Sequence, residues 1–263
     1  MALSIIVMGA AGRMGSTIAR LAEEADDLVL AAVLERPETL DRLDAFKASG
    51  VLVSSDISTV LPACPGAVVI DFTSPEASMV TARAAAACGN PVVIGTTGFS
   101  EQQLAELDDL ARDSLIFRSA NMSVGINVIM DLLPRLTALL GDAYDVEMME
   151  IHHNKKKDAP SGTALLLAEP ILEARGLTRA DINTNRFDVR EPRRHAEIGI
   201  QSLRGGDVVG VHTIYYMGPG ERIEITHQAH SRENFANGAL RAARWISSRR
   251  PGRVYNMQDV LHD

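Results

Sequence analysis

Residues 150–163, which read EIHHNKKKDAPSGT, hold the side chains best suited to acid–base chemistry in this chain of 263 residues. His152 and His153 precede three lysines, and a histidine side chain donates or accepts a proton near neutral pH. A lysine donates a proton more readily when burial lowers its pKa. Because the formal net charge of the chain is −8, this basic cluster differs from the rest of the sequence. We therefore expect a proton-transfer site here; the alternative is a solvated run of lysines after a strand end.

The same segment predicts a binding site for an anionic substrate. Residues 160–163 precede an apolar helix, and hydroxyl and free N–H groups at a helix N-terminus bind a carboxylate well. Apolar and polar residues alternate up to His152, so His152 and His153 are expected to point to opposite faces and to have different roles. Arg232 is a candidate for a second contact to the anion. No metal site is expected, because two adjacent histidines lack a third ligand at a suitable spacing.

Residues 9–15, GAAGRMG, predict a dinucleotide-binding turn between a first strand and a first helix. Their spacing is a variant of the G-x-G-x-x-G pattern, in which glycine permits a tight turn and a close approach to a pyrophosphate at the helix N-terminus. Glu35 follows the second predicted strand, about 20 residues further on, where an acid binds the adenosine ribose hydroxyls. Arg36 could instead pair with a 2′-phosphate, so either NADH or NADPH could bind. The alternative is a surface ion pair without a ligand.

Two further loops follow predicted strands at the same edge of the sheet. They are residues 95–99, GTTGF, and residues 119–122, SANM. In open α/β sheets, ligands bind beyond the carboxyl ends of the strands, and small residues there allow close contact with the nicotinamide and its ribose. Either loop could also be an ordinary connection.

The strands and helices expected around these candidate site residues indicate an α/β fold. Its first part is a Rossmann-like, doubly wound parallel sheet. Short apolar runs alternate with helical segments over roughly the first 120 residues, which is typical of a parallel sheet covered on both faces. Strands are expected at residues 4–8, 28–34, 67–72, 91–94 and 115–119, and helices at residues 14–25, 75–88 and 101–112.

The pattern then changes to that of a second, α+β domain with a mostly open mixed sheet. Its alternating strands leave one face for helices or a partner subunit. Helices are expected at residues 124–140 and 163–175, strands at 144–152, 198–203, 208–214 and 222–226, a long surface loop at 178–195, and a last helix at 233–248 that packs on the first domain. The predicted dinucleotide-binding domain is therefore 1–123 with 233–263, and the substrate-binding and oligomerisation domain is 124–232.

Composition narrows the function classes. Aromatic residues make up 4% of the chain and the net charge is negative, which disfavours binding to nucleic acid and to anionic membranes. Cys64 and Cys88 do not make a disulfide framework, which fits a reducing compartment. The first apolar run lacks a preceding basic region, and no apolar stretch of roughly 18 residues suggests a membrane span. We expect a cytoplasmic protein that acts on a small molecule.

Five blocks together resemble the 4-hydroxy-tetrahydrodipicolinate reductase (dihydrodipicolinate reductase) family of bacteria. The block at 152–163, HHNKKKDAPSGT, is highly specific, whereas the glycine block is not. The blocks extend over nearly the whole chain and are residues 9–15 (GAAGRMG), 71–76 (DFTSPE), 95–99 (GTTGF), 152–163 and 235–239 (FANGA).

The resemblance implies an NAD(P)H-dependent reduction in the diaminopimelate route to lysine. Hydride would pass to C4 of the dehydrated cyclic dicarboxylate derived from 4-hydroxy-tetrahydrodipicolinate, and protonation of the enamine would give tetrahydrodipicolinate. It further implies that His152 is the proton donor or acceptor, that Lys156 is the second proton donor, and that the protein is a homotetramer assembled through the sheet of the second domain. The substrate-binding residues would be His153, Ser161, Gly162 and Thr163, with Arg232 as a further candidate. The cofactor-binding residues would be Gly9, Ala10, Ala11, Gly12, Arg13, Met14, Glu35, Arg36, Gly95, Thr96, Thr97, Ser119, Ala120, Asn121 and Met122.

Some alternatives stay open at the level of sequence. Residues 154, 155 and 157 vary within the family, and three lysines leave the proton donor ambiguous by chemistry alone, although the motif position favours Lys156. The pair Glu35 and Arg36 leaves the preference between NADH and NADPH open. Another NAD(P)-dependent oxidoreductase of small amino-acid-derived substrates would make residues 152–163 a coincidence. A noncatalytic dinucleotide-sensing module would keep the glycine turn but would need no proton donor.

Overall fold

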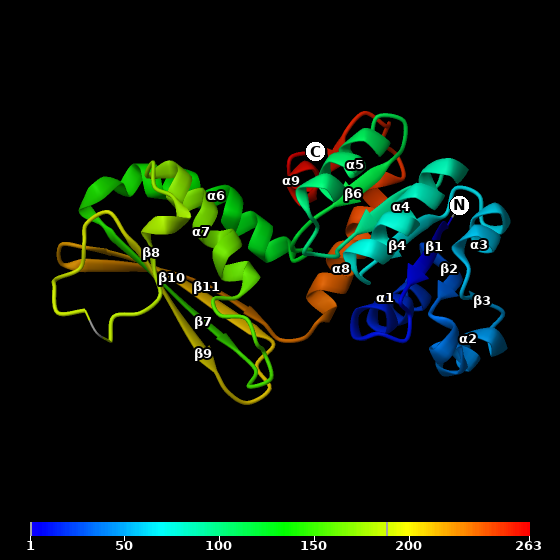
Figure 1. The fold of residues 1–263 in the computed structure, drawn as a ribbon, viewed down its shortest axis with the longest axis horizontal. Helices are drawn as coiled ribbons and strands as arrows, with labels where there is room; N and C mark the ends of the chain where they lie inside the picture. Colours follow the sequence, from blue (N-terminus) through cyan, green and yellow to red (C-terminus); the bar gives the residue numbers. More distant parts are fainter. Residues whose placement is uncertain (1, 188) are drawn as a thin grey trace. The chain divides into compact units, whose positions relative to one another are not determined.

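The computed structural model describes residues 2–187 and 189–263, and the chain divides into two compact units (Figure 1). The first unit combines Met1–Val124 with Arg232–Asp263, and the second is Gly125–Ser231. These junctions differ by one residue from the predicted ones. The difference places Arg232 in the first unit, whereas the sequence analysis put it in the second.

The first unit contains a seven-stranded sheet in the order β12-β6-β5-β4-β1-β2-β3, and every neighbouring pair is parallel. This arrangement confirms the predicted Rossmann-like fold. The strands are β1 (Leu3–Met8), β2 (Leu28–Leu34), β3 (Leu52–Ser54), β4 (Val68–Asp71), β5 (Val92–Ile94), β6 (Ile116–Arg118) and β12 (Val254–Tyr255). The helices are α1 (Arg13–Glu23), α2 (Asp44–Ala48), α3 (Ile57–Ala63), α4 (Pro75–Cys88), α5 (Glu101–Leu110), α8 (Glu233–Ile246), α9 (Met257–Leu261) and the 3-10 helix η1 (Pro37–Leu43).

Both faces of this sheet are buried because its strands are apolar at consecutive positions. In β1, Ile5 and Val7 enter one core with α1 and α8, while Ile6 enters a second core with α3 and α4. Sequence signals also fix the helix ends. Ser74 caps α4 by accepting a hydrogen bond from the N–H of Ala77, and Gln103 completes a capping box at the start of α5. Helices therefore begin just beyond the carboxyl ends of the strands.

The last long helix, α8, returns to the core of the first unit, as predicted. Ala236, Ala239, Leu240 and Ala243 are buried there together with residues of β1 and α1. A side chain at Gly238 would overlap the backbone carbonyl of Met122, so a glycine is needed for this close approach of the helix to residues 119–122.

The sequence analysis missed the short elements of this unit. They are η1, α2, β3 and α3 between residues 37 and 63, and β12 and α9 near the C-terminus. The helices α2 and α9 have five residues each, and β3 has three residues, none of them buried. Segments of this length do not display a helical or strand period, which explains why the pattern gave no signal.

The second unit contains a mixed five-stranded sheet in the order β11-β10-β7-β9-β8. The strands β11, β10 and β7 are antiparallel neighbours, whereas β9 is parallel to both β7 and β8. The predicted surface loop at 178–195 includes a 3-10 turn and β8, so it is not wholly irregular. The elements are α6 (Val124–Leu140), η2 (Gly141–Ala143), β7 (Asp145–His152), α7 (Gly162–Ala174), η3 (Arg179–Asp181), β8 (Ile182–Asn183), β9 (Ile198–Arg204), β10 (Gly210–Gly218) and β11 (Glu221–Ala229).

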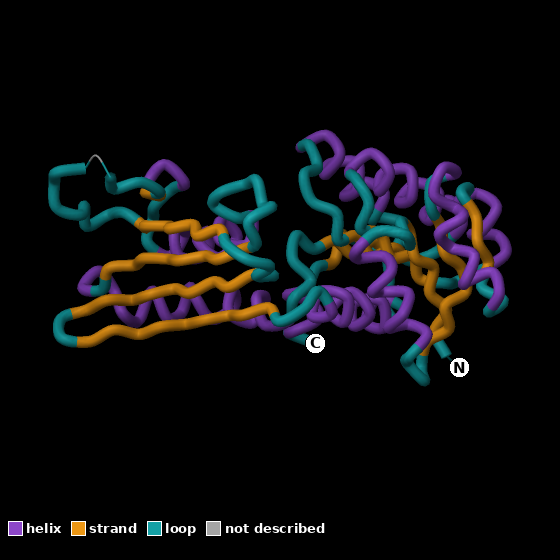
Figure 2. The backbone as a smooth tube through the Cα atoms, turned by 90° about the horizontal axis from the view of Figure 1, so that it is seen from below, coloured by secondary structure: helices purple, strands orange, loops and turns teal. Residues whose placement is uncertain are grey.

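Helices cover one face of this sheet, as Figures 1 and 2 show. The core between them contains Leu133 of α6 and Leu167 of α7, packed against Val146, Met148 and Tyr216 of the sheet. Alternate residues of β7 are buried along its whole length, which confirms the predicted alternation. The opposite face carries the intervening, partly exposed residues.

One helical segment, Val124–Ala143, is long and apolar enough to cross a membrane by length and composition. From the sequence we expected no apolar stretch of this length. Within the second unit, α6 contributes the buried Ile126 and Leu133 to the core. A helix that covers a sheet meets the same criteria as a membrane span, so the segment is weak evidence for a membrane.

Replacing Gly238 by alanine should lower the free energy of unfolding by at least about 2 kcal/mol, because the new methyl group must displace the backbone at Met122. Chemical denaturation followed by circular dichroism measures this change. Gly205→Ala is the control, since a Cβ at Gly205 has no atom within 4 Å. Equal stability of the two variants would contradict the close helix approach described here.

Candidate active site

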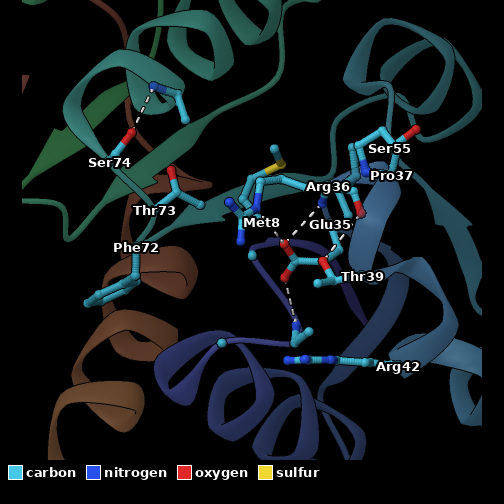
Figure 3. Close-up of a pocket in the computed structure, with 15 residues that line it drawn as sticks. Met8, Glu35, Arg36, Pro37, Thr39, Arg42, Ser55, Phe72, Thr73 and Ser74 are labelled. Atoms are coloured by element: carbon cyan, nitrogen blue, oxygen red, sulfur yellow. Dashed lines mark hydrogen bonds and ion pairs between the residues drawn. The ribbon is translucent and has the colours of Figure 1, made fainter.

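A pocket of about 550 Å³ lies where β1, β2 and β4 end in the first unit (Figure 3). The strands β2 and β4 flank β1 on its two sides, so the chain leaves the sheet in opposite directions around this point. Ligands of doubly wound sheets bind at such switch points. The pocket is lined by Met8, Gly9, Ala11, Gly12, Leu34, Glu35, Arg36, Pro37, Thr39, Arg42, Ser55, Phe72, Thr73, Ser74 and Ala77.

The glycine turn at residues 9–15 fits a dinucleotide sterically and electrostatically. Gly9 has φ +65°, and a Cβ at Gly15 would overlap the Gly9 carbonyl, so both positions need glycine for the turn to pack on α1. Gly12 caps α1 and, among the described residues, no side chain caps this helix. Its first N–H groups can therefore bind a phosphate. Ala10 and Gly15 are buried, whereas Gly12 and Arg13 are exposed and Met14 is half-buried.

Glu35 lies beside this turn, as Figure 3 shows. Its Oε2 accepts a hydrogen bond from the N–H of Ala11 at 3.0 Å, and its Oε1 accepts one from the N–H of Arg36 at 3.0 Å. The Glu35 side chain is only 10% exposed, so its carboxylate is fixed in the pocket wall. The Arg36 side chain is 80% exposed, with its Nε 3.8 Å from Glu35. Arg42, from η1, adds a second cation to the pocket that the sequence analysis did not identify.

The loop at residues 95–97 is tied to β4 by a buried network. Asp71, at the end of β4, accepts hydrogen bonds at one carboxylate oxygen from Thr73 and Ser78. The Ser78 hydroxyl oxygen, whose proton goes to Asp71, lies 2.8 Å from the hydroxyl of Thr96 and accepts from it, and Thr96 is buried. Gly95 packs so tightly on the ring of Phe72 that a Cβ would overlap it. Thr97 is exposed, so it is the side chain of this loop that is free to meet a ligand.

The loop at residues 119–122 is held by its own hydrogen bonds. The Ser119 hydroxyl donates to the carbonyl of Asn121 at 2.7 Å, and the Asn121 side chain accepts from the N–H of Ser123 at 2.8 Å. Ser119, Asn121 and Met122 are buried, and Ala120 is exposed. The predicted cofactor residues at this loop therefore shape the backbone, and only Ala120 presents an exposed surface.

A cluster of ionisable groups occupies the second unit where β7 ends. Strand register brings it together: on β7, Glu150 pairs with His212 of β10 and with Ser202 of β9, and His152 pairs with Arg204 of β9. All of these residues lie on the face of the sheet that carries α6 and α7, because Glu150 and His152 continue the buried alternation of β7.

Glu150 is the centre of this cluster and is 1% exposed. Arg204 donates to both of its carboxylate oxygens at 2.7 Å, and the N–H of Ser161 donates to Oε1 at 3.0 Å. Its Oε2 lies 2.6 Å from Nδ1 of His152. Burial raises the pKa of this carboxyl, but hydrogen bonds from Arg204, Ser202, His152 and Ser161 outweigh burial and bring the pKa to about 2. Glu150 is therefore a carboxylate at neutral pH.

His152 is 8% exposed, and its ring meets that of His212 edge to face with centroids 5.1 Å apart. Burial lowers the pKa of His152, and the Glu150 carboxylate opposes this effect. Nε2 of His212 lies 3.1 Å from the hydroxyl of Ser161. Burial and the neighbouring His152 lower the pKa of His212 to about 3, so His212 is neutral at neutral pH.

The structure separates the three lysines. Nζ of Lys156 lies 2.9 Å from Asp158, and its side chain is 21% exposed. Lys155 and Lys157 are exposed. Burial raises the pKa of Asp158, but the hydrogen bond from Lys156, with other contributions, brings the pKa below its ordinary value. Lys156 is thus the lysine of this segment that is held in place.

Of the remaining predicted substrate residues, Ser161, Gly162 and Thr163 lie at the start of α7. Ser161 caps the helix, since its hydroxyl accepts from the N–H of Ala164 at 3.1 Å, and Gly162 begins it. Gly162 is exposed and Thr163 half-buried. Nδ1 of His153 is buried and has no hydrogen-bond partner among the described residues. Arg232 lies in the first unit, just before α8.

Glu150, Arg204 and His212 are members of the cluster that the sequence analysis missed. The alternation that separated His152 from His153 also places Glu150 on the same face as His152, so a signal for Glu150 was present. Arg204 and His212 depend on pairing between strands that are far apart in the chain, and local patterns do not show this pairing.

Comparison with known proteins decides the family. The family model described as "Dihydrodipicolinate reductase, N-terminus" matches residues 3–122, and that described as "Dihydrodipicolinate reductase, C-terminus" matches residues 125–261. The chain belongs to the dihydrodipicolinate reductase family. It is therefore an oxidoreductase that uses NADH or NADPH, and the resemblance inferred from sequence is confirmed.

Individual relatives agree with this assignment. The 4-hydroxy-tetrahydrodipicolinate reductase of Nitratidesulfovibrio vulgaris strain DP4 is 59% identical over 99% of this chain and 100% of its own length. That of Anaeromyxobacter dehalogenans is 47% identical over 98% of this chain and 97% of its own. The dipicolinate-bound dihydrodipicolinate reductase from Paenisporosarcina sp. TG-14 has a similar fold, with a TM-score of 0.77 at 23% identity, covering 97% of this chain and 98% of that one.

The neutral state of His212 predicts a pH dependence of stability. Its pKa falls from 6.5 to about 3 on folding, so below pH 6.5 the unfolded chain binds a proton that the folded chain does not. The stabilisation is present above pH 6.5 and is lost as the pH falls toward 3. Between about pH 7.5 and about pH 5, the wild type should lose about 2 kcal/mol more unfolding free energy than His212→Gln. Urea denaturation at both pH values measures this difference; equal losses would show that His212 is protonated in the folded protein.

Proposed function

We propose that this chain reduces the dehydrated cyclic dicarboxylate formed from 4-hydroxy-tetrahydrodipicolinate to tetrahydrodipicolinate, with His152 and Lys156 as the groups that transfer protons. The observation that carries this assignment is the His152 ring, which the buried carboxylate of Glu150 holds beside the start of α7. Imidazole and ammonium groups near a helix N-terminus suit a dianionic substrate that must also take up a proton.

The first unit supplies the cofactor site in this proposal. Bound NADH or NADPH provides the hydride. Gly9, Gly12 and the first N–H groups of α1 bind the pyrophosphate, and Glu35 accepts hydrogen bonds from the adenosine ribose. Thr97 and Ala120 are the exposed residues of the two further loops and contact the other half of the cofactor. The buried Thr96, Ser119, Asn121 and Met122 hold those loops in shape.

The second unit binds the substrate and moves the protons. The N–H groups of Gly162 and Thr163 at the start of α7 bind one substrate carboxylate, as does His153, whose Nδ1 has no hydrogen-bond partner among the described residues. Reduction adds one hydride and one proton across the carbon–carbon double bond, so a proton donor is required. His152 and Lys156 supply it, and the dipicolinate bound to the Paenisporosarcina relative is itself a dicarboxylate.

We further propose that the chain forms a homotetramer through the open face of its five-stranded sheet and acts in the cytoplasm. Met149 and Ile151 of β7, Val211 and Tyr215 of β10 and Leu203 of β9 lie on the side of the sheet opposite α6 and α7. Leu203 is 43% exposed, and an apolar face of this kind suits association with further copies of the chain. The activity itself is tested by adding freshly made 4-hydroxy-tetrahydrodipicolinate to the protein and NAD(P)H and measuring the fall in NAD(P)H absorbance.

His152→Gln should lower kcat by about 10²–10⁴-fold and leave the dissociation constant of NADH unchanged, because the residue transfers a proton and lies outside the cofactor-binding unit. Lys156→Ala should also lose most turnover, whereas Lys155→Ala and Lys157→Ala should lose little. Steady-state kinetics and NADH fluorescence titration measure the two quantities. Near-normal turnover of His152→Gln would refute its role, and equal losses in the three lysine variants would indicate a diffuse electrostatic effect.

Arg36→Ala should weaken NADPH binding by about tenfold and change NADH binding far less, since only NADPH carries the 2′-phosphate that a guanidinium can bind. Calorimetric titration with each cofactor measures both constants. Arg241→Ala, an exposed arginine of α8, is the matched control. The same loss for NADH and NADPH would remove Arg36 from the cofactor site.

A further inference from the structure

The carboxylate of Glu150 is held in one orientation by its hydrogen-bond partners. Both oxygens are engaged: one meets Nδ1 of His152 and one nitrogen of Arg204, and the other meets the second nitrogen of Arg204 and the N–H of Ser161. Arg204 is itself held, because it also donates to the carbonyls of Leu203 and Asp158 at 2.7 Å. A bidentate pair fixed at both ends leaves the carboxylate little freedom to rotate.

This orientation determines which nitrogen of His152 carries the proton. An ionised carboxylate can only accept hydrogen bonds, so Nδ1 at 2.6 Å from Oε2 must be the donor. In the neutral imidazole, Nε2 is then left with its lone pair. A Cβ at Gly210 would lie 3.0 Å from Nε2, so the glycine keeps that side of the ring open.

The ionisable groups around His152 come from three strands and one loop. Glu150 lies on the same strand, Arg204 on β9, His212 on β10 and Lys156 on the loop after β7. Burial, Lys156 and Arg204 lower the pKa of His152, whereas Glu150 raises it by both its hydrogen bond and its charge. The Glu150 carboxylate thus favours the protonated form of His152, and His212, which is neutral at neutral pH, adds no opposing charge.

We propose that Glu150 is the positioning residue of the reaction: it fixes His152 with hydrogen on Nδ1 and presents Nε2 for proton exchange with the substrate, while Arg204 and the N–H of Ser161 hold Glu150 in place. This inference rests on the role of His152 proposed above. Arg204 acts through Glu150 and does not need to touch the substrate. The carboxylate thereby couples the start of α7, where the substrate carboxylate is expected to bind, to the ring that transfers the proton.

Nitrogen-15 NMR of the histidine side chains in the wild-type protein tests the tautomer directly. At a pH where His152 is neutral, Nδ1 should show the shift of a protonated nitrogen and Nε2 that of an unprotonated one. His152→Gln identifies the signal. A predominant Nε2–H tautomer would overturn the proposal, whatever the activity of the protein.

Glu150→Gln tests the consequence for catalysis. It should lower kcat by about 10-fold or more and leave NADH binding unchanged, because the neutral amide lacks the charge that favours imidazolium. The pKa of His152 should fall when the carboxylate is lost, so the alkaline limb of the pH–activity profile should shift to lower pH by about one pH unit or more. Glu150→Asp, which keeps the charge, should restore part of the wild-type pH profile.

Loss of Glu150 leaves Arg204 without its partner, so the single variant could fold poorly. The double variant Glu150→Gln with Arg204→Gln removes both charges together and keeps similar side-chain volumes. It should fold, bind NADH and show a mixture of His152 tautomers. Glu147→Gln is the matched control, since Glu147 lies on the opposite face of β7 and pairs with Arg193.

The outcomes separate this inference from the proposed function. If Glu150→Gln and the double variant keep the wild-type tautomer and pH profile while His152→Gln is inactive, Glu150 is merely structural and the inference fails. If His152→Gln is active, the proposed role of His152 fails first. A shifted profile and mixed tautomers, with Glu147→Gln unchanged, support Glu150 as the positioning residue.

Discussion

The packing of the second unit depends on the hydrogen bonds and the ion pair of one buried carboxylate, that of Glu150. It joins the central strand β7 to β9 through Arg204 and to the start of α7 through the N–H of Ser161. Removing one member of a buried, hydrogen-bonded ion pair commonly costs about 3–5 kcal/mol, because the other charge is left without compensation. The same carboxylate is hydrogen-bonded to the ring of His152, so one buried charge contributes both to the packing of the unit and to the proposed proton-transfer site.

The first unit meets a different constraint, which is the close approach of backbone segments. Gly9 and Gly15 allow the turn to pack against α1, and Gly238 allows α8 to pack against the loop at Met122. Side-chain hydrogen bonds through Asp71, Ser78 and Thr96 then fix the neighbouring loop. A site built from backbone N–H groups suits a pyrophosphate, whereas proton transfer requires ionisable side chains with a defined protonation state. The roles that we propose for the two units of the chain follow this difference in chemistry.

Much of the fold could be predicted from the sequence, because the buried parallel strands are runs of apolar residues and the helices between them carry caps. The strand predicted at residues 28–34 and the helix predicted at residues 75–88 agree with the structure. Short edge elements such as β3 lack such runs, since an edge strand of three partly exposed residues has no core-facing pattern.

The site was predictable only where the signal is local. His152, Lys156 and the turn at Ser161 lie in one contiguous motif. Glu150 is two residues from His152 and shares its face, but its role depends on Arg204, which is 54 residues away and is aligned by the register of β9 against β7. In the loop at 119–122, small polar residues predict ligand contact, and the structure adds that the side chains of Ser119 and Asn121 hydrogen-bond to the backbone of the loop. Composition alone cannot separate these two uses of a polar side chain.

The most direct test of the account is the titration of Glu150 itself, followed by carbon-13 NMR of its side-chain carboxyl, with Glu150→Gln used to assign the signal. The account predicts that this carboxyl stays ionised through the weakly acidic range and that in the folded protein it takes up a proton only near pH 2. A titration near 4.5, the ordinary value for glutamate, would show that Arg204, Ser161 and His152 do not hold it as described.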